Sequence, residues 1–187
     1  MIPEVKVDPL AIIEKYYEKG SEIYTILVNH SELVKNKALE IASKHPELHL
    51  DKQFIAEAAM LHDIGIFMCY APRIHCHGSH SYIEHGYLGA KILRTEGLYK
   101  HALVCERHTG IGISLDMILK NKLPLPHRDL LPISLEEKVI CYADKFYSKT
   151  NLNEKFTLQR IRTYLKRYGE SEVMRFNTWN LLFDDGK

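Results

Sequence analysis

The sequence lacks the features that mark membrane, secreted or strongly charged proteins. No apolar run approaches the roughly 20 residues that a membrane-spanning helix needs. The opening stretch "MIPEVKVDPL" has no basic-then-apolar pattern of a signal peptide. The 25 basic and 24 acidic residues nearly cancel, so the overall charge gives no general attraction to nucleic acid or to an anionic membrane. We therefore expect a cytoplasmic protein that binds neither membranes nor nucleic acid.

The sequence lacks the cysteine motifs of zinc ribbons and of thioredoxin-type redox proteins. The four cysteines include no C-x-x-C pair, which excludes a zinc ribbon and a thioredoxin-type motif. In a reducing cytosol we expect Cys69, Cys76, Cys105 and Cys141 to be free thiols that pack as small apolar side chains. Cys76 differs from the others because it lies among histidines, in "RIHCHGSH".

No segment has the alternating pattern of a β-strand, and no repeat or linker divides the chain. Apolar residues recur at helical spacing nearly throughout. A chain of 187 residues suits one domain with a sizeable core. We predict a single all-α domain over residues 1–187, with two closing helices over 157–184 that are split at Gly169.

Capping residues predict where the other helices begin. Asp8 and Pro9 indicate a helix that runs to about Lys19. Further predicted N-caps are Ser21, Asp51 and Ser114, and the capping boxes "SYIE" and "SLEE" start at Ser81 and Ser134. Residues 68–80 show little periodicity and are expected to form a loop.

Histidine, by contrast, is abundant, with eleven residues scattered along the chain. In "AAMLHDIGIF" an adjacent His62 and Asp63 stand inside an apolar run, where their burial is costly unless something pairs with them. Similar groups occupy interior-facing positions on other helical segments. The full set is His30, His62, Asp63, His85, His108 and Asp144.

Four imidazoles and two carboxylates form a plausible set of metal ligands. The mixed set favours iron or manganese, with zinc, nickel or magnesium as alternatives. Six ligands are too many for one catalytic ion with an open position, but they suit two ions bridged by one carboxylate, for which Asp63 is the natural candidate. A single interior histidine can instead be a hydrogen-bonded core residue, which is our expectation for His49, His101 and His127.

The order of these residues resembles the HD superfamily of metal-dependent phosphohydrolases, in its HDIG variety. The matching segments are "VNHSELV" with His30, "LHDIG" with His62 and Asp63, "EHGYLGA" with His85, "ERHTG" with His108 and "EEKVICYADKF" with Asp144. The resemblance spans about residues 23–148. It implies a bundle of about five core helices around a central metal site. Members with the histidines that His85 and His108 match typically hold two ions.

The resemblance implies an enzyme that hydrolyses a phosphate ester or anhydride, of a nucleotide or a related small molecule, with a metal-activated water. Asp63 would bridge the ions and orient that water. The alternatives are a mixed-valent di-iron oxygenase of the same superfamily, which uses the same ligands, and a catalytically idle binding module. "HTGIGIS" replaces the Gly-Tyr-Pro segment of cyclic-dinucleotide phosphodiesterases, and Phe67 replaces a lysine of dinucleoside polyphosphate hydrolases; both departures argue against those substrates.

Candidate substrate-binding residues lie near the expected centre. They are Arg73 in the 68–80 loop, Lys145 after Asp144, and Tyr147. The loop also carries His75, His77 and His80 and is a candidate lid. His80 competes with His85 as a ligand, and the capping box favours His85.

The stretch "TLQRIRTYLKRYG" predicts an amphipathic helix near the C-terminus. Its apolar face contains Leu158, Ile161, Leu165 and Tyr168, and its basic face contains Arg160, Arg162, Lys166 and Arg167. A basic helix face can bind nucleic acid, but the near-zero net charge favours a solvated outer surface, which is our expectation. The substrate, the metal and the oligomeric state are not readable from the sequence.

Overall fold

The computed structural model describes residues 7–183, which form an all-α structure with one small hairpin. The helices are α1 (Pro9–Ile13), α2 (Glu22–Lys44), α3 (Lys52–Leu61), α4 (His85–Thr95), α5 (Tyr99–Arg107), α6 (Leu115–Lys120), α7 (Leu135–Asp144), α8 (Leu158–Leu165) and α9 (Glu170–Phe183). Residues 1–6, which carry part of the signal-peptide expectation, and residue 184 of the expected last helix lie outside the described residues. No helix within 7–183 is long and apolar enough to cross a membrane.

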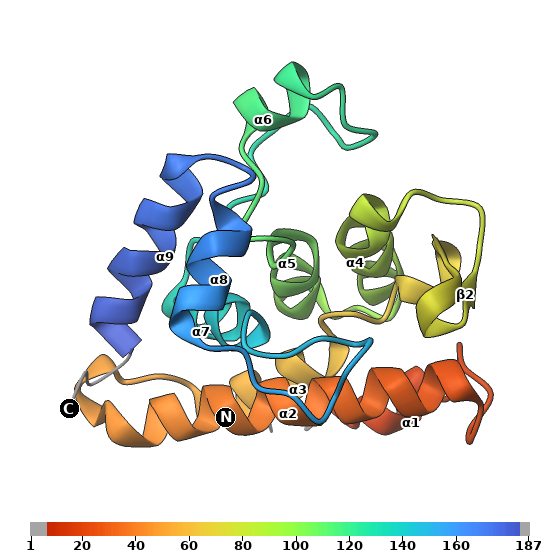
Figure 1. Ribbon diagram of the computed structural model, residues 1–187. Helices are drawn as coiled ribbons and strands as arrows, with labels where there is room; N and C mark the ends of the chain where they lie inside the picture. The colour runs from red at the N-terminus through yellow and green to blue at the C-terminus, as the bar shows by residue number, and fades with distance from the viewer. Residues whose placement is uncertain (1–6, 184–187) are drawn as a thin grey trace.

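The long helix α2 extends along one side of the molecule, and most of the other helices lie to one side of it (Figure 1). Helices α3 and α7 contact α2 directly, while α4 packs along α5. Helix α9 packs on α7 and α8. Helix α6 lies apart from the bundle, at the tip of an excursion between α5 and α7 (Figure 1). Helices α3, α5 and α7 also contact one another, so they form the centre of the bundle.

The apolar core has two main clusters that meet at the end of α3. One cluster, around Tyr142 and Phe176, includes Ala59 of α3, whereas the other includes Leu61 and Ile64. His62 and Asp63 follow α3 directly, so they lie where the two clusters join. The fold therefore places a polar pair between two apolar clusters, where its position is held on both sides.

The predicted helix starts are confirmed by their hydrogen bonds. The side chains of Asp8, Ser21, Asp51 and Ser114 each accept a backbone N–H from the first turn of the following helix. Both predicted capping boxes are present, at Ser81–Glu84 and Ser134–Glu137. The first box opens a 3-10 turn, Tyr82–Glu84, which leads into α4 at His85. This local geometry sets the position of His85 in the fold.

The structure corrects two predicted elements, the length of the first helix and the content of the 68–80 loop. The first helix ends at Ile13 rather than near Lys19, and the segment after it turns so that the buried Tyr17 donates a hydrogen bond to the Ile64 carbonyl at 2.7 Å. The 68–80 loop contains an antiparallel hairpin of β1 (Tyr70–Ala71) and β2 (Cys76–His77). Strands of two residues are too short to show a sequence periodicity.

Close packing against α4, and not an unusual backbone conformation, requires a glycine at position 65. Its φ of −86° is open to any residue. A Cβ at this position would lie 2.3 Å from the His85 carbonyl oxygen and 2.4 Å from the Gly89 nitrogen, both backbone atoms of α4. The glycine therefore permits α4 to approach the turn that carries Asp63. The four cysteines are buried and free, as expected.

Candidate metal centre

The six predicted ligands converge from five helices. Their positions are His30 in the middle of α2, His62 as the C-cap of α3 with Asp63 next to it, His85 at the start of α4, His108 as the C-cap of α5, and Asp144 at the end of α7. None is more than 8% exposed. Residues spread over more than a hundred positions of sequence therefore form one buried cluster.

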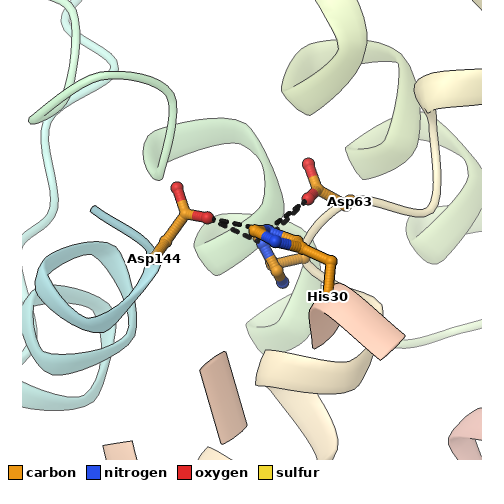
Figure 2. Close-up of side chains that lie close together, drawn as sticks. His30, Asp63 and Asp144 are labelled. Carbon is orange, nitrogen blue, oxygen red and sulfur yellow. Dashed lines mark hydrogen bonds and ion pairs between the residues drawn. The ribbon is translucent and has the colours of Figure 1, made fainter. Parts of the chain in front are cut away.

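One half of the cluster combines two imidazoles with two carboxylates. The Nε2 atom of His30 lies 2.9 Å from Oδ1 of Asp144 and 3.3 Å from Oδ2 of Asp63. The Nε2 atom of His62 lies 3.0 Å from the same Asp63 oxygen and 3.6 Å from Asp144 Oδ1. Figure 2 shows the carboxylates of Asp63 and Asp144 pointing toward the His30 ring from different elements. These four residues offer ligand atoms close enough to hold one ion.

The other half is formed around the second oxygen of Asp63. Oδ1 of Asp63 lies 3.2 Å from Nε2 of His85 and 3.3 Å from Nε2 of His108. These three residues form a second group that could hold an ion. Asp63 is the one member common to both groups, with Oδ2 facing the first and Oδ1 facing the second. This is the arrangement that a bridging carboxylate requires.

Three of the imidazole rings are oriented by backbone carbonyls three residues earlier in the chain. Nδ1 of His62, His85 and His108 lies 2.6, 2.6 and 2.7 Å from the carbonyl oxygens of Ala59, Tyr82 and Cys105. A carbonyl only accepts, so Nδ1 must carry the hydrogen and Nε2 of a neutral ring presents its lone pair to the cluster. Ligand orientation is thus supplied by the helix ends themselves.

The cluster has unpaired acceptors that divalent cations would satisfy. Nε2 of His85 and of His108 are only 3.0 Å apart, and with both Nδ1 atoms protonated neither neutral ring can donate to the other. Oδ1 of Asp63 is also buried and makes no hydrogen bond of acceptable geometry. Buried polar atoms without partners cost free energy, whereas cations between them would be stabilised. The residues therefore fit a metal centre.

The electrostatics keep the carboxylates ionised, as ligands must be. Burial alone would raise the pKa of Asp63, but His62 and Lys149 hold it well below its ordinary value. Burial has the same effect on Asp144, and Lys145 and His30 hold its pKa well below the ordinary value.

The pKa values of His108 and His62 are shifted in opposite directions. Burial lowers the pKa of His108 to about 4, so this ring is neutral at neutral pH. Burial would also lower the pKa of His62, but Asp63 and Asp144 raise it to about 9. Binding of a cation at His62 therefore has to displace a proton.

Two lysines approach the cluster, and the sequence predicted only one of them. Nζ of Lys145 lies 2.7 Å from Oδ2 of Asp144, and Nζ of Lys149 lies 2.6 Å from Oδ2 of Asp63. The sequence predicts Lys145 because it directly follows Asp144. Lys149 was missed because it lies in a turn beyond the end of α7, where helical spacing no longer predicts which way a side chain points.

A cavity of about 1030 Å³ borders the cluster. Its lining includes His85, His108 and Asp144, and it also includes the three predicted substrate-binding residues, Arg73, Lys145 and Tyr147. The structure therefore gathers these candidates in the wall of one cavity, although their role in substrate binding stays a prediction.

Other histidines lie outside the cluster. His75 pairs with Glu22 at 2.7 Å and His80 with Glu84 at 3.3 Å, so His85 rather than His80 reaches the centre. His101 is a buried core residue whose Nε2 lies 3.2 Å from Oε2 of Glu57, as expected. His49 and His127 were also expected to be core residues, but both are exposed.

Relatives of the chain include an uncharacterized protein and two named enzymes. One is the uncharacterized protein MJ0778 of Methanocaldococcus jannaschii, which is 36% identical over 148 residues, or 78% of this chain and 79% of the relative. Two others are named tRNA (cytidine(56)-2'-O)-methyltransferase, from Thermoplasma volcanium and Picrophilus torridus, each 32% identical. These alignments cover 75% and 70% of this chain but only 37% and 34% of the methyltransferases, so this chain corresponds to about a third of those relatives.

No solved structure matches the chain significantly. The sequence profile of the HD domain matches residues 27–148, which is well over half of the chain. The matched segment contains all six residues of the buried cluster. The chain therefore belongs to the HD domain family, within the HD superfamily of metal-dependent phosphohydrolases.

Proposed function

We propose that this protein is a metal-dependent phosphohydrolase that cleaves a phosphate ester or anhydride of a nucleotide or nucleotide-like molecule. The proposal depends on one observation, which is that the two carboxylate oxygens of Asp63 face different pairs of histidines. One of its oxygens faces His30 and His62, and the other faces His85 and His108. Such a carboxylate is suited to join two ions beneath the cavity.

Divalent ions held by these two groups would supply Lewis acidity that activates water and neutralises charge on a phosphoryl group. The chain's own residues supply the remaining functions. Asp63 and Asp144 remain ionised and orient the ligand set. Lys145 and Lys149 bring two ammonium groups to the edge of the centre, where they would bind phosphoryl oxygens. The apolar clusters on both sides hold the ligand side chains in position.

The charges around the cavity support an anionic substrate. Arg73, Lys145 and Lys149 all line it. The names of two relatives also point toward nucleotide chemistry, because their aligned third is part of proteins that act on tRNA. The substrate class proposed here is accordingly a phosphorylated nucleotide rather than an uncharged metabolite.

Metal content and hydrolysis test the proposal together. Protein purified without added metal would be analysed by plasma mass spectrometry and then assayed with manganese against nitrophenyl phosphates and nucleotides. We expect two ions per chain and phosphate release, both lost in Asp63→Asn. His62→Gln should lose them too, whereas His101→Gln, which alters a buried histidine outside the centre, should retain both.

Two results would contradict the proposal. Asp63→Asn with wild-type metal content and wild-type rates would remove the basis for a bridging carboxylate. Two irons per chain, an electronic spectrum that changes with dioxygen and no phosphate release from any ester would instead support the oxygenase alternative.

A further inference from the structure

We propose that the cavity has a second subsite that binds a nucleobase and its phosphate, so that the preferred ligand is a single-stranded oligonucleotide rather than a mononucleotide. The subsite is the α8 wall, defined as Arg160, Tyr164, Arg167 and Tyr168. The proposal deepens the proposed function, because it names the substrate class of the same cavity. Binding at the α8 wall does not depend on hydrolysis and can be measured separately.

The size and continuity of the cavity are the first argument. The same cavity that borders His85, His108 and Asp144 is also lined by all four residues of the α8 wall. Its volume of about 1030 Å³ is at the top of the range of about 300–1,000 Å³ that is usual for small-molecule pockets. A ligand with one phosphate at the metal centre therefore leaves space along the α8 wall for further nucleotides.

Charge is the second argument. The guanidinium groups of Arg73 and Arg167 have no ion-pair or hydrogen-bond partner among residues 7–183, and both line the cavity. Two acids also line the cavity, but Glu172 pairs with Arg175 at 3.1 Å and Asp144 pairs with Lys145 at 2.7 Å. Arg160 is paired with Glu154 and stacks over the Phe156 ring at 3.9 Å. The cavity thus has unneutralised cations at more than one place, as a ligand with successive phosphates requires.

Two exposed tyrosines are the third argument. Tyr164 and Tyr168 are 50% and 54% exposed, with ring centroids 5.4 Å apart and hydroxyl oxygens 2.9 Å apart. Exposed rings beside arginines form the usual platform on which proteins stack unpaired bases. An ion or a small ester would make no use of these rings.

One sequence expectation is corrected by this placement, and another is extended. Tyr168 was expected on the apolar inner face, but the core contacts of the helix are made by Ile161 and Leu165, which are 2% and 1% exposed. Arg160 and Arg167 are exposed, as expected of a solvated face, and they also line the cavity. The net charge of +1 therefore conceals a local basic surface, and the expectation that nucleic acid is not a ligand no longer follows from it.

Fluorescence anisotropy of a labelled hexauridylate tests the proposal. The full chain would be titrated in EDTA, where no cleavage occurs, and again with manganese. Unlabelled uridine monophosphate and a deoxyuridine hexamer would serve as competitors. We expect either hexamer to bind at least tenfold more tightly than the monophosphate, and the tighter hexamer identifies the preferred sugar.

Variants of the α8 wall separate stacking from charge. Tyr164→Leu with Tyr168→Leu should weaken hexamer binding about tenfold without changing its salt dependence, and the two Phe substitutions at the same positions should preserve binding. Arg167→Gln should reduce the slope of log K against log salt by about 0.7. Lys166→Gln is the matched control, because this lysine neighbours Arg167 but does not line the cavity and pairs with Glu170.

The results can overturn the proposal without reference to catalysis. It is overturned if the monophosphate competes as well as the hexamers, or if Arg167→Gln and Lys166→Gln change the salt slope equally. It is also overturned if the Leu and Phe pairs weaken binding to the same extent. Hexamer binding with these variant effects, but with no hydrolysis of any ester, would support the subsite and reject the phosphohydrolase.

Discussion

Replacing Gly65 by alanine should remove one half of the metal centre and leave the other half. The added Cβ would lie 2.3 Å from the His85 oxygen and 2.4 Å from the Gly89 nitrogen. Both are backbone atoms of α4, so they cannot rotate away as a flexible side chain could. Helix α4 must therefore move away from the turn that carries Asp63.

The size of this displacement follows from the contact distances. Ordinary contact with a Cβ begins at 3.4 Å, so α4 has to retreat by about 1 Å, a shift that is sufficient to disable a catalytic geometry. His85 begins α4, and its Nε2 lies 3.2 Å from Asp63 Oδ1. The displacement should take His85 out of ligand reach. Overpacking of this kind costs about 1–3 kcal/mol of folding free energy, or a melting temperature lower by about 5 °C.

The assay combines metal analysis with thermal unfolding of manganese-loaded protein. We expect Gly65→Ala to hold one ion where the wild type holds two, because His30, His62 and Asp144 are not on α4. Leu93→Ala is the matched control. Leu93 is a fully buried residue of α4, and its truncation costs about 2–5 kcal/mol without adding an atom beside Gly65.

The control should melt at a lower temperature and still hold two ions. The reasoning is refuted if Gly65→Ala melts like the wild type with unchanged metal content. It is equally refuted if Leu93→Ala loses as much metal, because loss of metal would then reflect general instability.

The structure predicts the direction of the effect of three further substitutions on stability or on manganese binding. Glu106 is buried between Arg94 and Arg128; burial would raise its pKa, but the two arginines lower it below its ordinary value of 4.5. The ionised Glu106 carboxylate therefore stabilises the fold above pH 4.5, and this contribution is lost as the pH falls below that value. Glu106→Gln should lower the free energy of unfolding in urea by about 2 kcal/mol at neutral pH and by less in acid. Lys149→Met should tighten manganese binding in calorimetry, because the ammonium group 2.6 Å from Asp63 competes with the ion; weaker binding would contradict this. Ser134→Ala removes the hydrogen bond from the Glu137 N–H and should cost about 1 kcal/mol by the same urea assay, whereas an unchanged midpoint would show that the cap is dispensable.

Features that depend on neighbouring residues were predicted well. The capping boxes at Ser81 and Ser134 are formed as expected, because a cap is completed within one turn of the chain. The ordered ligand series was visible because each member belongs to a local motif. The first helix was predicted too long, since the Tyr17 bond to Ile64 joins residues that are 47 positions apart.

The sequence by itself determined that the chain is all-α and belongs to a metal-centred family, and it determined which six side chains meet. Only the tertiary structure decided how they meet: Asp63 directs one oxygen to each group, and Lys149 enters from a turn after α7. Only the packing of α8 and of the turn that follows it decided that Arg167 and Tyr168 line the cavity. The physical reason is the same in each case. Spacing predicts the helices and their apolar faces, whereas the direction of a polar side chain depends on which helix ends lie opposite it.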